Sequence, residues 1–199
     1  MKKKKGLLFI LCLIIFILIA VSVSQNKVIN LDNIIYNFVK QFTCLPLTIL
    51  FKIITFMAST SFFVIVCLII LIFIKKKKHA VLIVSNLINT VIMNQTFKVL
   101  FARPRPVVSS IIMETGYSFP SGHTMAAMSF YGFFVYLVWQ TKLAKNKKIF
   151  ISIILTFLIF LVGLSRVYLG VHFVSDVVGA VCLSTIYLII YTKIISKYL

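Results

Sequence analysis

A histidine and an aspartate four residues apart, His172 and Asp176, stand between two long apolar stretches of the sequence. Ionisable side chains are costly in or beside a membrane, so a pair kept in such a place indicates a function. On a helix, residues spaced by four share one face, and the carboxylate can then accept the proton of one imidazole nitrogen. The other nitrogen is left free as a base, a ligand or a nucleophile. Taken alone, the pair is explained equally well as an ion pair at a helix start.

The arginines of the chain form a second group of interest. All three, Arg103, Arg105 and Arg166, lie near a histidine or an aspartate, whereas every other basic residue is a lysine. A guanidinium is a planar fork that binds phosphate or carboxylate oxygens in pairs, so this choice of arginine predicts an oxyanion site. Contacts between arginines and lipid headgroups are the alternative explanation.

The run Pro120-Ser121-Gly122-His123 predicts the start of a helix, because proline is favoured in the first helical turn. A helix start presents backbone N–H groups and the positive end of the dipole, which suit a phosphate. Gly122 allows the backbone close to a ligand, and Ser121 adds a hydroxyl donor. His123, on the first turn, can then serve as a general acid. By itself such a run is more often only a helix start.

The composition indicates an integral membrane protein. The 199 residues are 61% hydrophobic, and the mean hydropathy is +1.11. The formal net charge of +18 comes mainly from lysines at the ends of apolar segments, where they signal membrane topology. No soluble region is available to bind nucleic acid, so we expect no nucleic-acid partner.

Six apolar segments are long enough to cross a membrane as helices. They cover residues 6–23, 53–74, 80–100, 120–139, 149–164 and 173–192. The third is the most polar and is expected to face protein or water rather than lipid. Residues 24–52 are predicted to carry a short interfacial helix between the first two spans. The predicted fold is therefore all-α, a six-helix membrane bundle forming one domain over residues 1–199. A signal peptide is the alternative for the first segment, but its apolar length favours a retained helix.

Lysine-rich segments predict the orientation. They fall at the N-terminus, at 75–78, at 142–148 and at the C-terminus, and six spans place all four on one side. By the positive-inside rule this side is cytoplasmic. Both termini are then cytoplasmic, and the segments with His123 and His172 face outward.

These residues together resemble a known signature. Lys98 precedes Arg105-Pro106 by six intervening residues, and Pro120-Ser121-Gly122-His123 follows. Ser165-Arg166, His172 and Asp176 complete the pattern. The order and spacing resemble the three-part signature of the type 2 phosphatidic acid phosphatase (PAP2) superfamily, with the core motifs in residues 98–176. Arg103 does not fit the family spacing and is expected to be an additional phosphate or headgroup contact.

The resemblance implies a role for each residue. His172 would attack phosphorus and form a phosphohistidine, Asp176 would orient it, and His123 would protonate the leaving group and later activate water. The phosphate-binding residues that it implies are Lys98, Arg105, Ser121, Gly122 and Arg166. Asp176 is the single carboxylate in this set, so a two-metal mechanism lacks ligands, and we expect neither metal nor other cofactor. Glu114, in the same outward loop, is expected to be an exposed acid.

The resemblance implies a membrane lipid phosphatase of the cell membrane. Undecaprenyl diphosphate is the first choice of substrate because the predicted site faces outward, followed by phosphatidylglycerophosphate and phosphatidic acid. A lipid phosphotransferase with an acceptor other than water is one alternative. A non-catalytic lipid transporter or anion-binding membrane protein is another, although transport requires no nucleophile with an orienting acid.

Overall fold

The computed structural model describes residues 2–74, 77–106 and 110–197, and it is helical, with no strand in these ranges. The helices are α1 (Lys2–Ser24), α2 (Ile29–Lys40), α3 (Leu45–Phe56), α4 (Thr60–Phe73), α5 (Lys77–Phe101), α6 (Gly122–Gln140), α7 (Lys145–Tyr168) and α8 (Val174–Ile195). A helix satisfies its backbone hydrogen bonds internally, which is what a long apolar segment requires inside a bilayer. The predicted all-α class is confirmed.

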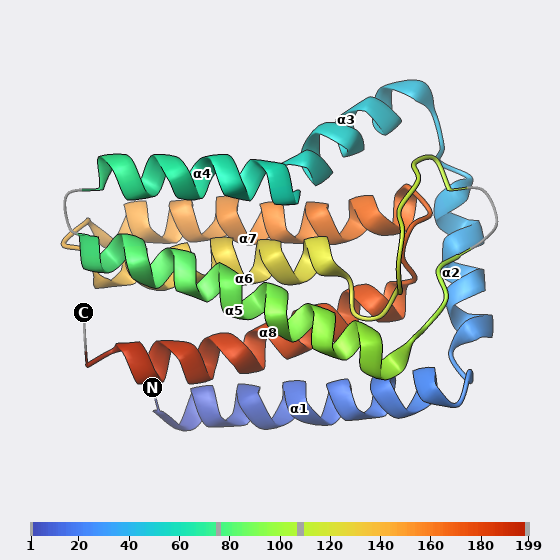
Figure 1. The fold of residues 1–199 in the computed structure, drawn as a ribbon, viewed down its shortest axis with the longest axis horizontal. Helices are drawn as coiled ribbons and strands as arrows, with labels where there is room; N and C mark the ends of the chain where they lie inside the picture. Colours follow the sequence, from blue (N-terminus) through green and yellow to red (C-terminus); the bar gives the residue numbers. More distant parts are fainter. Residues whose placement is uncertain (1, 75–76, 107–109, 198–199) are drawn as a thin grey trace.

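The long helices lie side by side, and α2 lies across one end of the bundle (Figure 1). A helix is therefore present between the first two predicted spans, where a short one was expected. Its relation to a membrane surface is considered below with the proposed function.

Among the described residues, length and composition allow four helices to cross a membrane, namely α1, α5, α7 and α8, and the pair α3 and α4 could form a fifth span. Residues 53–74, predicted as the second span, do not form one continuous helix: α3 ends at Phe56 and α4 begins at Thr60, and the two meet at an angle of 44°. Ser59 lies between the two helices. Its hydroxyl accepts the backbone N–H of Phe62 at 3.2 Å, which caps the start of α4. The count of six spans stays a prediction.

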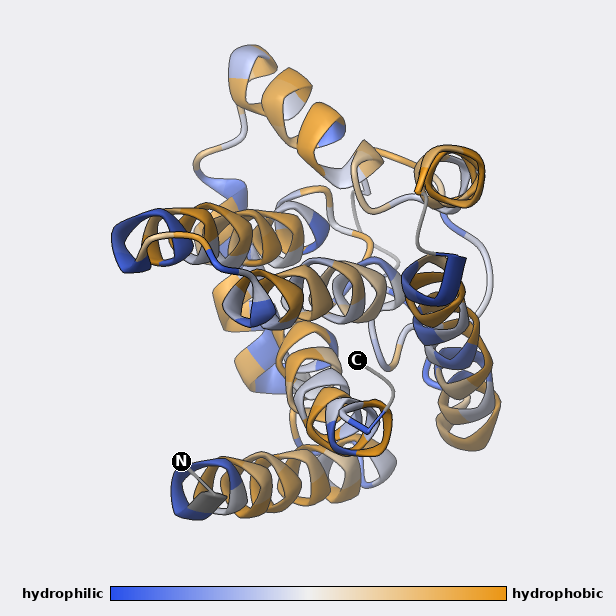
Figure 2. Ribbon diagram, turned by 90° about the vertical axis from the view of Figure 1, so that its left-hand side faces the viewer, coloured by the Kyte–Doolittle hydropathy of each residue, from blue (hydrophilic) through white to orange (hydrophobic). Residues whose placement is uncertain are grey.

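The lysine-rich ends of the helices gather at one end of the bundle. Helices α1, α5 and α7 begin at this end and α8 finishes there (Figure 1). Hydrophilic residues mark the helix ends that face the viewer in Figure 2. Lys75 and Lys76, the first half of the predicted run 75–78, lie outside the described residues. The described lysine-rich segments therefore lie together at one end of the bundle, and the three motifs lie toward the opposite end.

Some polar side chains of α5 point into the bundle, as predicted for the third span, whereas Asn89, Gln95 and Thr96 are exposed. The Asn86 side-chain amide donates to the backbone carbonyl of Ser129 at 2.8 Å, and Asn86 and Asn94 are buried. The hydroxyls of Ser85 and Tyr191 are 2.8 Å apart and link α5 to α8. These contacts fix α5, which carries Lys98, against α6 and α8.

Candidate active site

His172 and Asp176 are in contact, as their spacing predicts. His172 Nδ1 lies 3.3 Å from Asp176 Oδ2, and both side chains are buried. His172 precedes α8 rather than lying on it, so the pair joins a turn to the first turn of that helix. Burial lowers the pKa of His172 to about 4, although the hydrogen bond with Asp176 opposes the shift. The imidazole is therefore neutral at pH 7, and with the proton on Nδ1 its lone pair is on Nε2, which faces Arg105.

Several donors hold the Asp176 carboxylate in place. Its Oδ2 accepts the backbone N–H of Phe173 at 2.9 Å and the hydroxyl of Ser118. Its Oδ1 accepts from Arg103 Nη1 at 2.6 Å. The carboxylate is thus fixed from both oxygens, which in turn fixes the orientation of the His172 ring. Ser118 was not predicted, because nothing in its sequence surroundings distinguishes it from other loop serines.

Arg166 lies in the last turn of α7 and not in the turn predicted after residue 164, because the helix continues to Tyr168. Its side chain is fully buried. Nη1 donates to Thr55 Oγ1 at 2.7 Å, and Nη2 donates to Glu114 Oε1 at 2.5 Å. The predicted phosphate ligand is therefore oriented by α3, through a threonine that the sequence did not single out.

Glu114 is not the exposed loop acid that was predicted. Besides its ion pair with Arg166, its Oε2 lies 3.9 Å from Arg105 Nη2. Burial raises the pKa of Glu114, but the charge and hydrogen bond of Arg166, together with the charges of His123 and Arg105, hold this pKa below its usual value. An ionised carboxylate thus lies between two guanidiniums that the signature assigns to a phosphate.

Arg105 lies beside the nitrogen that is expected to attack phosphorus. Its Nη1 is 3.2 Å from His172 Nε2 and donates to the Val171 carbonyl at 3.0 Å. Nε and Nη2 donate to the backbone carbonyls of Gly116 and Thr115, each at 3.0 Å. These carbonyls hold the guanidinium where it can contact an oxygen of a phosphoryl group bound next to His172.

A helix starts close to the predicted place, but Pro120 is not in its first turn: α6 begins at Gly122, with Ser121 as its N-cap. Ser121 Oγ accepts the backbone N–H of Thr124 at 3.5 Å and lies 2.9 Å from Thr124 Oγ1. In this structure the Ser121 hydroxyl therefore caps the helix. A Cβ atom at Gly122 would lie 3.1 Å from Asn94 Oδ1, so this position leaves little room for a larger residue.

Asn94 supports the same helix start from α5. Its side-chain amide donates to the Pro120 carbonyl at 3.0 Å, and the asparagine is buried. The polar character of this segment indicated that it packs against protein, but the sequence did not indicate that Asn94 contacts the signature.

Lys98 and His123 complete the cluster. Lys98 lies in the last turn of α5 and His123 in the first turn of α6. Electrostatic interactions link His123 with Arg166, Glu114 and Lys98, and link Lys98 with Arg105. The structure thus brings all three predicted motifs to one site.

Arg103 is not an additional phosphate contact, and that prediction is wrong. Its guanidinium is buried and pairs with Asp176 at 2.6 Å and with Asp32 at 2.7 Å. The carbon between its nitrogens lies 4.2 Å from the centre of the Phe173 ring. Both terminal nitrogens of the guanidinium are paired with carboxylates inside the protein, so they are not available to bind a ligand.

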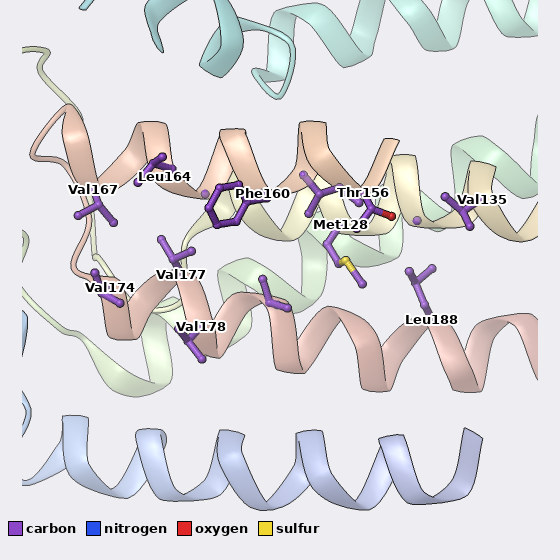
Figure 3. A pocket seen from close by; sticks show the side chains of 14 residues that line it. Met128, Val135, Thr156, Phe160, Leu164, Val167, Val174, Val177, Val178 and Leu188 are labelled. Carbon is purple, nitrogen blue, oxygen red and sulfur yellow. The ribbon is translucent and has the colours of Figure 1, made fainter. Parts of the chain in front are cut away.

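An apolar groove of about 630 Å³ lies between α6, α7 and α8 (Figure 3). Met128, Phe160, Val177 and Leu188 are among the residues that line it. None of the predicted site residues does, so we do not assign the phosphate to this groove. Within the described ranges, no group of three or more His, Cys, Asp or Glu side chains is placed to hold a metal ion.

Replacing Glu114 with glutamine is expected to strengthen inhibition by inorganic phosphate, because an anion then no longer competes for Arg166. We expect the inhibition constant for phosphate to fall roughly tenfold, the size of one charge-assisted hydrogen bond. The inhibition constant would be measured from the rate of lipid hydrolysis at increasing phosphate. Thr115→Ala, an exposed neighbour that uses only its backbone carbonyl, is the control. Weaker or unchanged inhibition in Glu114→Gln would contradict the prediction.

Comparison with known proteins gives a consistent result. Residues 79–198 match the sequence model of the PAP2 superfamily. A segment of 90 residues is 42% identical to phosphatidylglycerophosphatase B of Bacillus subtilis (strain 168). This segment covers 44% of the present chain and 44% of that relative, which is less than half of its length.

Two solved structures resemble the fold of this chain. One is a transmembrane PAP2 type phosphatidylglycerolphosphate phosphatase from Bacillus subtilis, with a TM-score of 0.87 and 27% identity over 95% of this chain and 96% of that one. The other is LpxE of Aquifex aeolicus, with a TM-score of 0.64 and 24% identity over 82% of this chain and 95% of that one. The second likeness concerns the fold alone.

Proposed function

Because the chain belongs to the PAP2 superfamily, we propose that it is an integral membrane phosphatase that hydrolyses the phosphate of a lipid. One observation carries this proposal: a neutral histidine, His172, is oriented by Asp176 and directs its Nε2 at the guanidinium of Arg105. Such an arrangement supplies a nucleophile and a phosphate-binding group at one point. A protein that only binds or moves lipids needs the second but not the first.

In the proposed first step, His172 Nε2 attacks phosphorus, an N–P bond forms, and the P–O bond to the lipid breaks. His123, protonated at the start of the reaction, donates a proton to the departing oxygen and becomes neutral. Asp176 stabilises the positive charge that the His172 ring gains. In the second step, His123 takes a proton from water, which attacks phosphorus and releases inorganic phosphate and the free imidazole. Most of the catalytic effect in such a transfer comes from positioning and charge stabilisation.

Five residues are proposed to hold the phosphoryl oxygens. They are Lys98, Arg105, Ser121, Gly122 and Arg166. The guanidinium of Arg166 is buried and oriented by Thr55, which supports a fixed, bidentate contact. The backbone N–H groups at the start of α6 add an electropositive surface. The carboxylate of Glu114 must leave Arg166 when the phosphate arrives.

The names of the relatives favour phosphatidylglycerophosphate as the substrate. This order differs from the one that the sequence alone suggests, in which undecaprenyl diphosphate comes first because of the predicted outward orientation. We propose phosphatidylglycerophosphate first, undecaprenyl diphosphate second and phosphatidic acid third. All three carry a phosphate at the end of a lipid, so the same phosphoryl-binding cluster can hold each of them.

The proposal is tested by phosphate release from the protein purified in detergent, with EDTA present. Phosphatidylglycerophosphate, undecaprenyl diphosphate and phosphatidic acid are compared side by side. We expect release to survive EDTA, since the site offers only Asp176 and Glu114 as carboxylates, and the order of kcat/KM to identify the substrate. Consumption of lipid without release of phosphate would favour a phosphotransferase instead. Lipid binding without any turnover would favour a transporter or binding protein.

We propose that α2 lies in the outer membrane interface. Leu31, Ile34 and Phe38 recur at helical spacing and are exposed, whereas Asp32 on another face is buried against the bundle. A helix with one apolar exposed face that lies across the end of the bundle suits the headgroup boundary (Figure 1).

The proposed topology has six spans, cytoplasmic termini and an extracytoplasmic site, and it predicts which residues a membrane-impermeant thiol reagent can reach. In a background with all four cysteines replaced by alanine, Met113→Cys should react in intact cells. Asn146→Cys should react only after the membrane is opened. Both positions are exposed, so accessibility to solvent is matched. The reverse labelling pattern would invert the proposed orientation.

A further inference from the structure

The polar network of the site continues beyond the groups proposed to touch substrate and ends at Asp32 of α2. This aspartate is 2% exposed. Its Oδ1 accepts the backbone N–H of Ser175 at 3.0 Å, and its Oδ2 accepts the Ser175 hydroxyl at 2.5 Å. Oδ2 also accepts from Arg103 Nη2 at 2.7 Å. A buried carboxylate with this many donors has a defined position.

Arg103 connects this aspartate to Asp176. Its Nη2 contacts Asp32, and its Nη1 contacts Asp176 Oδ1 at 2.6 Å and the Ser175 hydroxyl at 2.7 Å. The guanidinium is a rigid plane, so the position of one carboxylate constrains the position of the other. Asp176 in turn contacts His172. A continuous series of contacts therefore runs from Asp32 through Arg103 and Asp176 to His172.

The charges of the residues in this series of contacts have a second consequence. One buried cation lies between two buried anions, so the group retains a net negative charge toward His172. Without Asp32, Arg103 would have Asp176 as its one ionic partner and would draw that carboxylate away from the imidazole. The ring becomes positive when it bonds to phosphorus, and a neutralised Asp176 would stabilise that charge less.

We propose that Asp32 is a positioning residue for the phosphoryl transfer, acting through Arg103 to orient Asp176 and to preserve its negative charge toward His172. The inference rests on the proposed phosphatase function. Asp32 comes from the helix that lies across the end of the bundle, more than 60 residues before the first signature residue, Lys98. A purely structural role, in which Asp32 only ties α2 to α8, is the competing explanation.

The kinetic test uses Asp32→Asn in the full chain, which keeps the shape of the side chain and removes its charge. We expect kcat to fall roughly tenfold, the scale of effects from outlying members of a hydrogen-bonded network. KM should stay within about twofold, because neither Asp32 nor Arg103 contacts the phosphate. Asp32→Glu, which restores the charge, should recover part of the lost kcat. Asn33→Ala, on the exposed face of α2, is the matched control and should behave as wild type.

A second variant acts on the other end of the same contact. Arg103→Lys keeps the charge but cannot bridge two carboxylates with separate nitrogens. It should lower kcat by a similar factor, and the double variant with Asp32→Asn should lose less than the product of the two single effects. Strictly multiplicative losses would overturn the proposal, because they would mean that the two residues act independently.

An independent readout does not use activity. The chain has three histidines, so nitrogen NMR of ¹⁵N-histidine-labelled protein in detergent can be assigned with single replacements. The Nδ1 resonance of His172 should shift in Asp32→Asn and not in Asn33→Ala. An unchanged kcat and an unchanged resonance, with or without a lower unfolding temperature, would mean that Asp32 only holds α2 against α8. This result would overturn the inference. Absence of hydrolysis by wild type would count against the proposed function alone, because the resonance is still measured.

Discussion

Replacing His172 with alanine is expected to lower kcat for lipid phosphate hydrolysis by at least about 10⁴-fold, because the reaction loses its nucleophile. The structure gives this residue the required features: it is buried, its Nδ1 is held by Asp176, and Arg105 lies 3.2 Å from its Nε2. The measurement is phosphate release under saturating lipid. A second measurement follows covalent labelling of the protein by lipid carrying ³²P in the phosphate.

The labelled bond should be stable to base and labile to acid, as expected of phosphorus on an imidazole nitrogen, and it should be missing from His172→Ala. His79→Ala is the matched control, since His79 begins the match to the family but lies in the first turn of α5, at the lysine-rich end. Turnover by His172→Ala at a rate near that of wild type would remove this residue from the mechanism. Labelling of His172→Ala would move the nucleophile to another group.

Replacing His123 with alanine is expected to reduce kcat for a lipid substrate by about 10²- to 10⁴-fold, the usual contribution of a general acid. The alkoxide of a lipid is a poor leaving group and needs the proton. An aryl phosphate such as p-nitrophenyl phosphate does not, so its first step should survive in this variant. The second step still needs a base to activate water.

Rapid-mixing experiments with p-nitrophenyl phosphate separate these two steps. His123→Ala should release nitrophenolate in a burst stoichiometric with enzyme, followed by slow turnover as the phosphoenzyme accumulates. Wild type is the reference for the size and rate of the burst. Equal losses for the lipid and the aryl phosphate, without a burst, would exclude His123 as the proton donor and activator of water.

Local spacing made part of this site predictable. His172 and Asp176 are four residues apart, and a turn running into a helix brings such residues together whatever the rest of the fold does. The helix start after Pro120 was predictable for the same reason, since the serine that caps it acts within one turn. The polar residues of α5 indicated burial against protein because lipid cannot satisfy them.

The roles of the remaining charged residues depended on contacts between distant segments. Arg103 and Arg105 have similar sequence surroundings, yet Arg103 pairs with Asp32 and Asp176 while Arg105 reaches His172. Which arginine turns toward which group depends on how the loop crosses the bundle end. Glu114 likewise looked exposed, because no local pattern indicated that this loop folds back onto Arg166.

Packing against small residues could not be predicted from the sequence either. The Phe119 ring rests on α8, where a Cβ atom at Gly179 would approach it to 2.6 Å. This contact helps to place the helix start that follows Phe119, but a lone glycine in an apolar helix gives no such signal. The bend between α3 and α4 was easier to predict from the sequence. The Ser59-Thr60-Ser61 run can cap a helix inside an otherwise apolar stretch.

The contacts of Arg166 and Arg103 also bear on where the working unit of this protein begins. The match to the family starts at residue 79, but Thr55 orients Arg166 and Asp32 binds Arg103 from segments that precede it. A fragment from His79 onward would carry every signature residue and would leave these two buried guanidiniums short of partners, which is strongly unfavourable. Grafting the signature helices into another membrane protein would meet the same difficulty unless α2 and α3 were transferred with them.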